Sequence, residues 1–280
     1  MLGEDLRLTG VAALALLLAA LLGGCGTAPA PAPAPSSSAP LPTPMPRPTH
    51  AVAAPEPRAG ACHTLTYQQA LASTAPSAEV PCTRTHTAQT YAVGRIDDVV
   101  DGHLLAVDST RVQHQVASSC PASLPGYLGR SADALRLTML RAVWFTPTLD
   151  QAAAGARWYR CDVVVLSGST LAPLTAPLKG VLSSPRAGQY AMCGTAKPGA
   201  PGFQRVPCSA PHTWKALSVV PLAAGPYPGQ QAVQAAGTAQ CQQAAANTAP
   251  NALDYQWGYD WPSAQQWAAG QTYGVCWAPS

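Results

Sequence analysis

The sequence contains few isoleucines, phenylalanines and charged residues. Charged residues make up 10% of the 280 residues, Ile96 is the only isoleucine, and Phe145 and Phe203 are the only phenylalanines. The formal net charge of +3 is too small to indicate nucleic acid or an acidic substrate as the partner. The core must therefore be assembled from Leu, Val, Ala, Tyr and Trp, which is little material for a stable domain.

Carboxylates are also scarce where a hydrolase would need them. No Asp or Glu occurs between residues 163 and 253, and the second half of the chain holds only Asp254 and Asp260. Catalysis by a pair of carboxylates is thus poorly supported. The sequence also lacks the G-x-S-x-G, P-loop and H-E-x-x-H motifs. These absences predict a protein that is not an enzyme, with no catalytic residue, no cofactor and no metal site.

The N-terminus indicates the compartment. Residues 11–22 form an unbroken apolar run, which has the length of a signal-peptide core and is too short to span a bilayer. The run ends in Leu22-Gly23-Gly24-Cys25, which resembles a bacterial lipobox. We therefore expect residues 1–24 to be a lipoprotein signal peptide and Cys25 to carry the lipid (palmitate). The protein would then lie on the extracytoplasmic face of the cell membrane. An ordinary signal peptide with an incidental cysteine is the alternative.

Residues 25–60 have the composition of a linker. Eleven of the residues from 26 to 60 are proline, many of them alternating with alanine. Such a segment buries too little apolar surface to fold and favours an extended polyproline II conformation. It predicts a spacer between the lipid anchor and the folded part.

The remainder of the chain is a tandem repeat. The first copy contains Val80-Pro81-Cys82 with His86 four residues later, and the second contains Val206-Pro207-Cys208 with His212 at the same distance. The ends of the halves also align, because Pro147, Gly155 and Cys161 have the same spacing as Pro262, Gly270 and Cys276. We therefore expect a first repeat at 61–166, a connector at 167–184 and a second repeat at 185–280.

Four cysteines belong to each repeat, and an even number in an exported chain predicts disulfides. Three connectivities are open within each half, and we favour first with second and third with fourth. In each half the first two cysteines flank a turn-rich stretch, while the third lies in a helical segment (112–119 or 230–248) and the fourth in an apolar strand (158–166 or 272–277). The expected pairs are Cys62–Cys82, Cys120–Cys161, Cys193–Cys208 and Cys241–Cys276. Zinc is a weaker reading, because no C-x-x-C occurs and export oxidises thiols.

These features predict an α+β fold. It would consist of two tandem disulfide-stapled repeats, each a small antiparallel sheet with one helix. Neither half has enough core material to stand alone, so we expect the halves to pack together as a pseudo-symmetric pair.

The same residues resemble a known family. The shared pattern comprises Cys62, Val80-Pro81-Cys82, His86, the segment 155–162, Val206-Pro207-Cys208, Pro211-His212, Trp267, Gly270 and Cys276-Trp277. It is similar to the actinobacterial septum-formation domain family, whose members are exported or membrane-attached proteins associated with cell division. Members often carry an acid three residues after the histidine, whereas this chain has Gln89 and Lys215 there. The resemblance implies a process, septum formation, and supplies no reaction.

Two groups of side chains are candidates for binding. His86 and His212 occupy equivalent positions, either as a metal ligand or general base or, as we favour, as structural residues whose rings bind backbone carbonyls. The second group is Tyr255, Trp257, Tyr259 and Trp261, which alternate and would face one side of a strand. They would form either a platform that stacks on sugars or a partner peptide or, as we favour, the core of the second half.

The sequence therefore predicts a non-catalytic, lipid-anchored envelope protein. It would bind a protein partner or a cell-wall glycan or peptide, in septum formation by the resemblance, and no nucleic acid. The alternative is an envelope hydrolase or metal-binding protein that uses His86 and His212.

Overall fold

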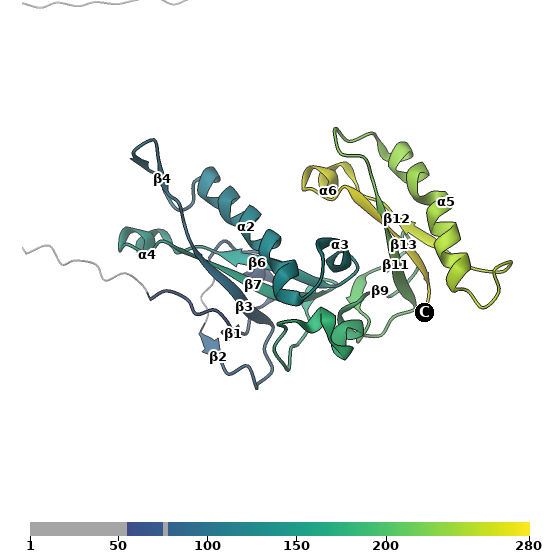
Figure 1. Ribbon diagram of the computed structural model, residues 1–280, viewed down its shortest axis with the longest axis horizontal. Helices are drawn as coiled ribbons and strands as arrows, with labels where there is room; N and C mark the ends of the chain where they lie inside the picture. Colours follow the sequence, from purple (N-terminus) through teal and green to yellow (C-terminus); the bar gives the residue numbers. More distant parts are fainter. Residues whose placement is uncertain (1–54, 75–77) are drawn as a thin grey trace, which may run out of the picture. The chain divides into compact units, whose positions relative to one another are not determined.

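Figure 1 shows the computed structural model, which describes residues 55–74 and 78–280. The predicted signal peptide, Cys25 and the linker up to residue 54 lie outside these residues. Within the described ranges, no helix is both long enough and apolar enough to cross a membrane.

The first half contains an antiparallel sheet with the strand order β2-β1-β3-β7-β6, to which β8 adds at β7. Its strands are β1 (Cys62–His63), β2 (Glu79–Val80), β3 (Ala88–Arg95), β6 (Leu140–Phe145), β7 (Trp158–Ser167) and β8 (Thr170–Leu171). A separate hairpin is formed by β4 (Val99–Val100) and β5 (His103–Leu104). The helices are α1 (Tyr67–Ala70), α2 (Thr110–Leu128), α3 (Ala132–Leu135) and α4 (Leu149–Ala153).

The second half repeats this arrangement, with the strand order β10-β9-β11-β13-β12. Its elements are β9 (Met192–Gly194), β10 (Arg205–Pro207), β11 (Trp214–Pro221), α5 (Gln230–Thr248), β12 (Gly258–Asp260), α6 (Ala264–Ala268) and β13 (Tyr273–Pro279). All strand pairs in both sheets are antiparallel. The predicted α+β class with small antiparallel sheets is therefore confirmed.

The two sheets also share their register. The pairing register of the two long central strands shifts between Thr90 and Ala92 in the first half (β3 with β7) and between Ala216 and Ser218 in the second (β11 with β13). Around this irregularity Thr90 lies opposite Asp162, while Ala216 lies opposite Trp277. Positions around this irregularity thus have equivalents in the other sheet, so the side chains that occupy the same place can be compared directly.

One long helix lies on one face of each sheet, α2 in the first half and α5 in the second (Figure 1). The helix α5 has the predicted bounds, whereas α2 extends beyond the predicted segment 112–119 and contains Pro121 and Pro125. Each proline removes a hydrogen bond from the helix. Burial of a residue at every fourth position compensates, through Val112, Val116, Cys120, Leu124 and Leu128.

Four disulfides fix these elements, and they join the pairs expected from the order of the cysteines. They are Cys62–Cys82, Cys120–Cys161, Cys193–Cys208 and Cys241–Cys276. The second and fourth tie α2 to β7 and α5 to β13. In each half the long helix is therefore covalently held on its sheet.

The connector between the halves is packed into the core. One buried cluster joins residues of both halves to four side chains from this stretch, Leu174, Leu178, Val181 and Leu182. Val181 begins the short 3-10 helix η1 (Val181–Ser183), and a second one, η2 (Pro185–Tyr190), follows it. Backbone bonds also join the halves, because Met139 donates to the Tyr190 carbonyl at 2.8 Å and Met192 donates to the Leu137 carbonyl at 2.8 Å. The halves share a core, and their pseudo-symmetric packing stays a prediction.

Candidate functional site

The repeated histidines make the same local contact. Nδ1 of His86 lies 2.8 Å from the Arg84 carbonyl, and Nδ1 of His212 lies 2.8 Å from the Ala210 carbonyl. His86 is fully buried, and its backbone N–H donates to the Leu174 carbonyl at 3.0 Å. Each ring thus closes a turn behind the second cysteine of its repeat.

His212 also lies beside a disulfide. Its ring and the sulfurs of Cys193 and Cys208 have ligand atoms within 4.8 Å of one another. The two sulfurs are bonded to each other, so they offer no thiolate to a metal ion. Among residues 55–74 and 78–280, no hydrogen bond or group of ligand atoms joins His86 to His212.

The aromatic residues of the second half divide between core and surface. The strand β12 covers only Gly258–Asp260, so the predicted strand through all four rings is not formed. Tyr259 is buried, and its hydroxyl donates to the Val233 carbonyl at 3.1 Å. Trp257 and Trp261 are half-buried and line a cavity of ≈ 220 Å³, and Tyr255 is also half-buried.

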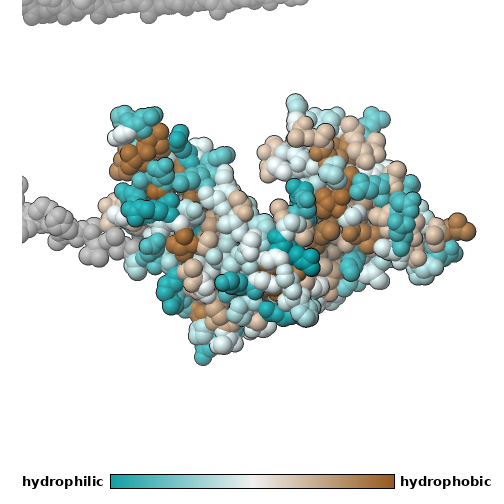
Figure 2. All heavy atoms as spheres, in the orientation of Figure 1, coloured by the Kyte–Doolittle hydropathy of each residue, from teal (hydrophilic) through white to brown (hydrophobic). Residues whose placement is uncertain are grey.

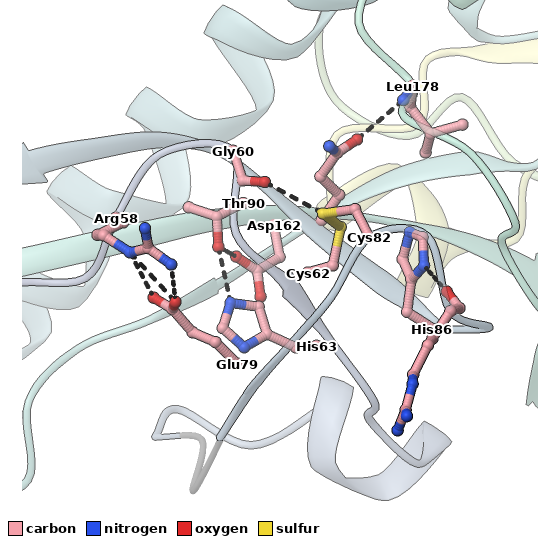
Figure 3. Close-up of a disulfide and its surroundings, with 12 residues drawn as sticks. Arg58, Gly60, Cys62, His63, Glu79, Cys82, His86, Thr90, Asp162 and Leu178 are labelled. Atoms are coloured by element: carbon pink, nitrogen blue, oxygen red, sulfur yellow. Dashed lines mark hydrogen bonds and ion pairs between the residues drawn. A yellow bond between two sulfur atoms is a disulfide. The ribbon is translucent and has the colours of Figure 1, made fainter.

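The first half holds a buried polar cluster that the sequence did not reveal. Nε2 of His63 lies 3.0 Å from the Thr90 hydroxyl, which donates to the Asp162 carboxylate at 2.7 Å. The other carboxylate oxygen lies 3.0 Å from the Arg160 guanidinium. His63 is 2% exposed, Arg160 5%, and Thr90 and Asp162 0%. Figure 3 shows His63, Thr90 and Asp162 side by side, with the Arg58–Glu79 pair to their left.

Three strands bring these side chains together. His63 lies on β1, Thr90 on β3, and Arg160 and Asp162 on β7. Residues two apart on a strand face the same side of a sheet, so Arg160 and Asp162 share the face that is opposite the α2 disulfide. The guanidinium of Arg160 also lies 4.8 Å from the centre of the Phe145 ring, which fixes it against the edge strand β6.

Burial sets the charges of the cluster. Desolvation, assisted by the positive charge of Arg160, lowers the pKa of His63 from 6.5 to about 4. Desolvation raises the pKa of Asp162 from 3.8 to about 6, although Arg160 and Thr90 partly oppose it. At neutral pH the cluster therefore holds a neutral imidazole and an ionised Asp162–Arg160 pair.

The hydrogen bonds also assign the tautomer of His63. A threonine hydroxyl has one proton to donate, and Thr90 gives it to Asp162. Nε2 of His63 must then be the donor toward Thr90. The neutral ring is held in the Nε2–H form.

The second half shows that the fold does not require this cluster. The places of His63, Thr90, Arg160 and Asp162 are taken by Gly194, Ala216, Val275 and Trp277. Trp277 is fully buried and meets Phe203 edge-on, with ring centres 5.4 Å apart. A side chain at Gly194 would collide with Phe203 and crowd Trp277. The same frame is thus packed with apolar groups, which commonly stabilises a protein as well as a buried ion pair or better.

A cavity of ≈ 750 Å³ opens over the polar cluster of the first half. Its lining includes His63, Trp158 and Arg160 from the sheet, Thr146, Thr148 and Gln151 from the β6–α4 connection and α4, Thr74, Glu79, and residues 55–58. Arg58 and Glu79 form an ion pair at its edge, and the Gly60 N–H donates to the Thr90 carbonyl at 2.8 Å. The packed chain therefore begins before residue 61, and this cavity has the size usual for small-molecule sites.

The buried position of the cluster limits its chemistry. The Thr90 hydroxyl and the Asp162 carboxylate are shielded from solvent, so neither can reach a substrate in the cavity. His63 and Arg160, by contrast, line the cavity and are held rigidly from behind. The arrangement suits binding with preorganised groups better than proton transfer.

An exposed apolar patch lies elsewhere, at the β4–β5 hairpin (Figure 2). Val99 is 55% and Leu104 65% exposed there, and Leu149 of α4 is 59% exposed. Patches of this kind are often covered by a protein partner.

Comparison with known proteins gives one match. The model of the family described as septum formation matches residues 59–276. No curated protein and no solved structure matches the chain significantly.

Proposed function

The chain belongs to the septum-formation family, and on this premise we propose that it is a non-catalytic, lipid-anchored envelope protein that binds an envelope ligand during septum formation. The ligand site is the ≈ 750 Å³ cavity of the first half. Family membership supports a role in cell division, and the cavity supports a role in binding.

One observation carries the choice of site. The two sheets have the same order of main strands but carry different side chains at equivalent positions. The second sheet buries the apolar ring of Trp277 there, whereas the first has a buried Asp162–Arg160 pair with a cavity over it. Buried ions and an open cavity both reduce stability relative to an apolar filling. The ion pair and the cavity occur in the first repeat alone and lower its stability, so we infer that they serve binding.

The lipid anchor rests on the sequence. Cys25 follows the apolar run 11–22 after two glycines and lies outside the described residues. Lipid at this cysteine would hold the protein at the extracytoplasmic face of the membrane. Replacing Cys25 with alanine is expected to abolish lipid incorporation, which mass spectrometry of the exported protein measures.

The geometry around the repeated histidines supports the proposal that the protein is not an enzyme. The rings of His86 and His212 bind backbone carbonyls, and no carboxylate of the described residues bonds to either ring. Thr90 and Asp162 are closed to solvent. The alternative, a hydrolase or metal-binding protein built on His86 and His212, has no such support.

Filling the cavity tests the proposed function. Gln151 lines the cavity and closes a capping box at the start of α4, and Gln266 closes the equivalent box of α6 outside the cavity. Gln151→Trp and Gln266→Trp therefore disturb equivalent caps, and the first alone obstructs the cavity. In cells that depend on the gene, we expect Gln266→Trp to restore normal septa and Gln151→Trp to leave misplaced or delayed septa under the microscope. Equal complementation by both variants at equal protein levels would refute the proposed site.

A further inference from the structure

We propose that the cavity of the first half binds an uncharged carbohydrate segment, such as a short run of N-acetylated sugars in an envelope glycan. This inference rests on the proposed function and adds the chemical class of the ligand. It follows from the charges, the neutral polar groups and the aromatic ring that line the cavity.

The cationic side chains of the cavity are already paired within the protein, and the remaining charged lining residue, Glu56, is an exposed carboxylate that would repel an anion. Arg58 is bridged to Glu79, and Arg160 is bridged to Asp162. His63 is neutral at neutral pH, because burial lowers its pKa to about 4. A phosphate or carboxylate ligand would have to compete with Glu79 or Asp162 for a guanidinium, at a cost in desolvation. The lining therefore favours a ligand without net charge.

Neutral polar groups surround one side of the cavity. Thr74, Thr146 and Thr148 offer hydroxyls, and Gln151 offers an amide. Two of them are held in place, because Thr146 accepts a bond from Gln113 at 3.2 Å and Thr148 accepts one from the Gln151 backbone at 3.2 Å. Fixed hydroxyls and amides match the hydroxyl and acetamido groups of a sugar, which both donate and accept hydrogen bonds.

An aromatic ring and the Arg58–Glu79 ion pair complete the lining. Trp158 lies on β7 two residues before Arg160, on the same side of the strand. The negative face of an indole attracts the weakly positive C–H groups on the flat side of a sugar ring. A paired guanidinium and carboxylate, as in Arg58–Glu79, can donate to one sugar hydroxyl and accept from its neighbour. An uncharged sugar uses all three kinds of group at once.

Binding of neutral sugars to the exported protein, with its disulfides intact, tests this proposal. Calorimetric titrations use the trimer of N-acetylglucosamine, maltotriose, a peptide ending in a free D-alanine carboxylate, and inorganic phosphate. We expect the N-acetylglucosamine trimer to bind the natural protein and to bind Gln151→Trp at least tenfold more weakly. Gln266→Trp is the control for the altered helix cap and should keep the natural affinity.

A second control separates the two aromatic cavities. Trp257→Leu changes the ≈ 220 Å³ cavity of the second half and should leave sugar affinity unchanged. No binding by either sugar, binding of the peptide or phosphate instead, or equal losses in Gln151→Trp and Gln266→Trp would each overturn the proposal. If sugars do not bind while Gln151→Trp alone still fails to restore septation, the ligand class is wrong and the proposed function stands. If both variants restore septation, the proposed function itself fails.

Discussion

The buried pair of His63 and Asp162 predicts opposite pH dependences of stability that cancel in the natural protein. The pKa of Asp162 is raised from 3.8 to about 6, so between these values the folded state holds a proton that the unfolded state has released. Stability from this group therefore falls as the pH rises from 4 to 6. The pKa of His63 is lowered from 6.5 to about 4, so here the unfolded state holds the extra proton and stability rises with pH.

Single substitutions should reveal the pH dependence of stability that each of the two residues contributes. One pKa unit corresponds to about 1.4 kcal/mol, so a shift of about two units makes each effect about 3 kcal/mol between pH 4 and 6. In His63→Gln the Asp162 effect remains, and stability should fall by about 3 kcal/mol relative to the natural protein over this range. In Asp162→Asn the His63 effect remains, and stability should rise by about the same amount. Glutamine and asparagine keep a hydrogen-bonding group toward Thr90.

Urea unfolding at several pH values between 4 and 7, followed by tryptophan fluorescence with the disulfides intact, measures these slopes. Subtracting the natural protein removes the contribution of all other carboxylates. In the double variant the free energy of unfolding should depend on pH as little as in the natural protein, whatever its absolute value. Parallel pH profiles for both single variants and the natural protein would refute the assigned ionisation states. Nitrogen NMR shifts of His63 should also report a neutral ring down to about pH 5, with the Nε2–H form above about pH 6, where Asp162 is ionised.

Two further predictions concern the frame of the fold. In Gly126→Ala the new methyl group on α2 meets open space, so this variant should be more stable by about 0.5–1 kcal/mol. In Gly237→Ala the new methyl group on α5 overlaps the Tyr259 ring, so this variant should be less stable. The same urea assay compares the two variants, and a gain of stability in both would contradict the packing of Tyr259. Removal of the disulfide between α2 and β7, which closes 41 residues, should cost about 4 kcal/mol, against about 3 kcal/mol for Cys193–Cys208, which joins β9 to the residue after β10 and closes 15. Unfolding of paired Cys→Ala variants measures both costs, and a larger loss for the shorter loop would contradict the chain-entropy account.

The sequence predicted those features that depend on local pattern. The bounds of α5 follow from its Ala- and Gln-rich composition, and the disulfide pairs follow from the order of the cysteines in the repeat. The helix α2 was predicted too short, because Pro121 and Pro125 argue locally against a helix. Burial at every fourth position, together with the bond from Cys120 to β7, outweighs that local preference.

The candidate site escaped prediction because it depends on register. His63, Thr90 and Asp162 are far apart in the sequence, and only the pairing of β1 with β3 and of β3 with β7 brings them together. Asp162 follows Cys161 in the first repeat, whereas Trp277 follows Cys276 in the second, so the acid is not duplicated. This mismatch was the available signal, because an acid and an arginine alternate there on an otherwise apolar strand.

The placement of the cysteines has a mechanical consequence for the proposed anchor at Cys25. Tension along the chain enters and leaves each covalent loop at its two cysteines, and the residues between them carry no load. Apart from residues 55–58, the whole lining of the first-half cavity lies inside the loops closed by Cys62–Cys82 and Cys120–Cys161. A pull between the proposed anchor and a polymer in the cavity, by contrast, would load the gripping residues themselves, and the two disulfides would limit how far the loops that carry them can be drawn out.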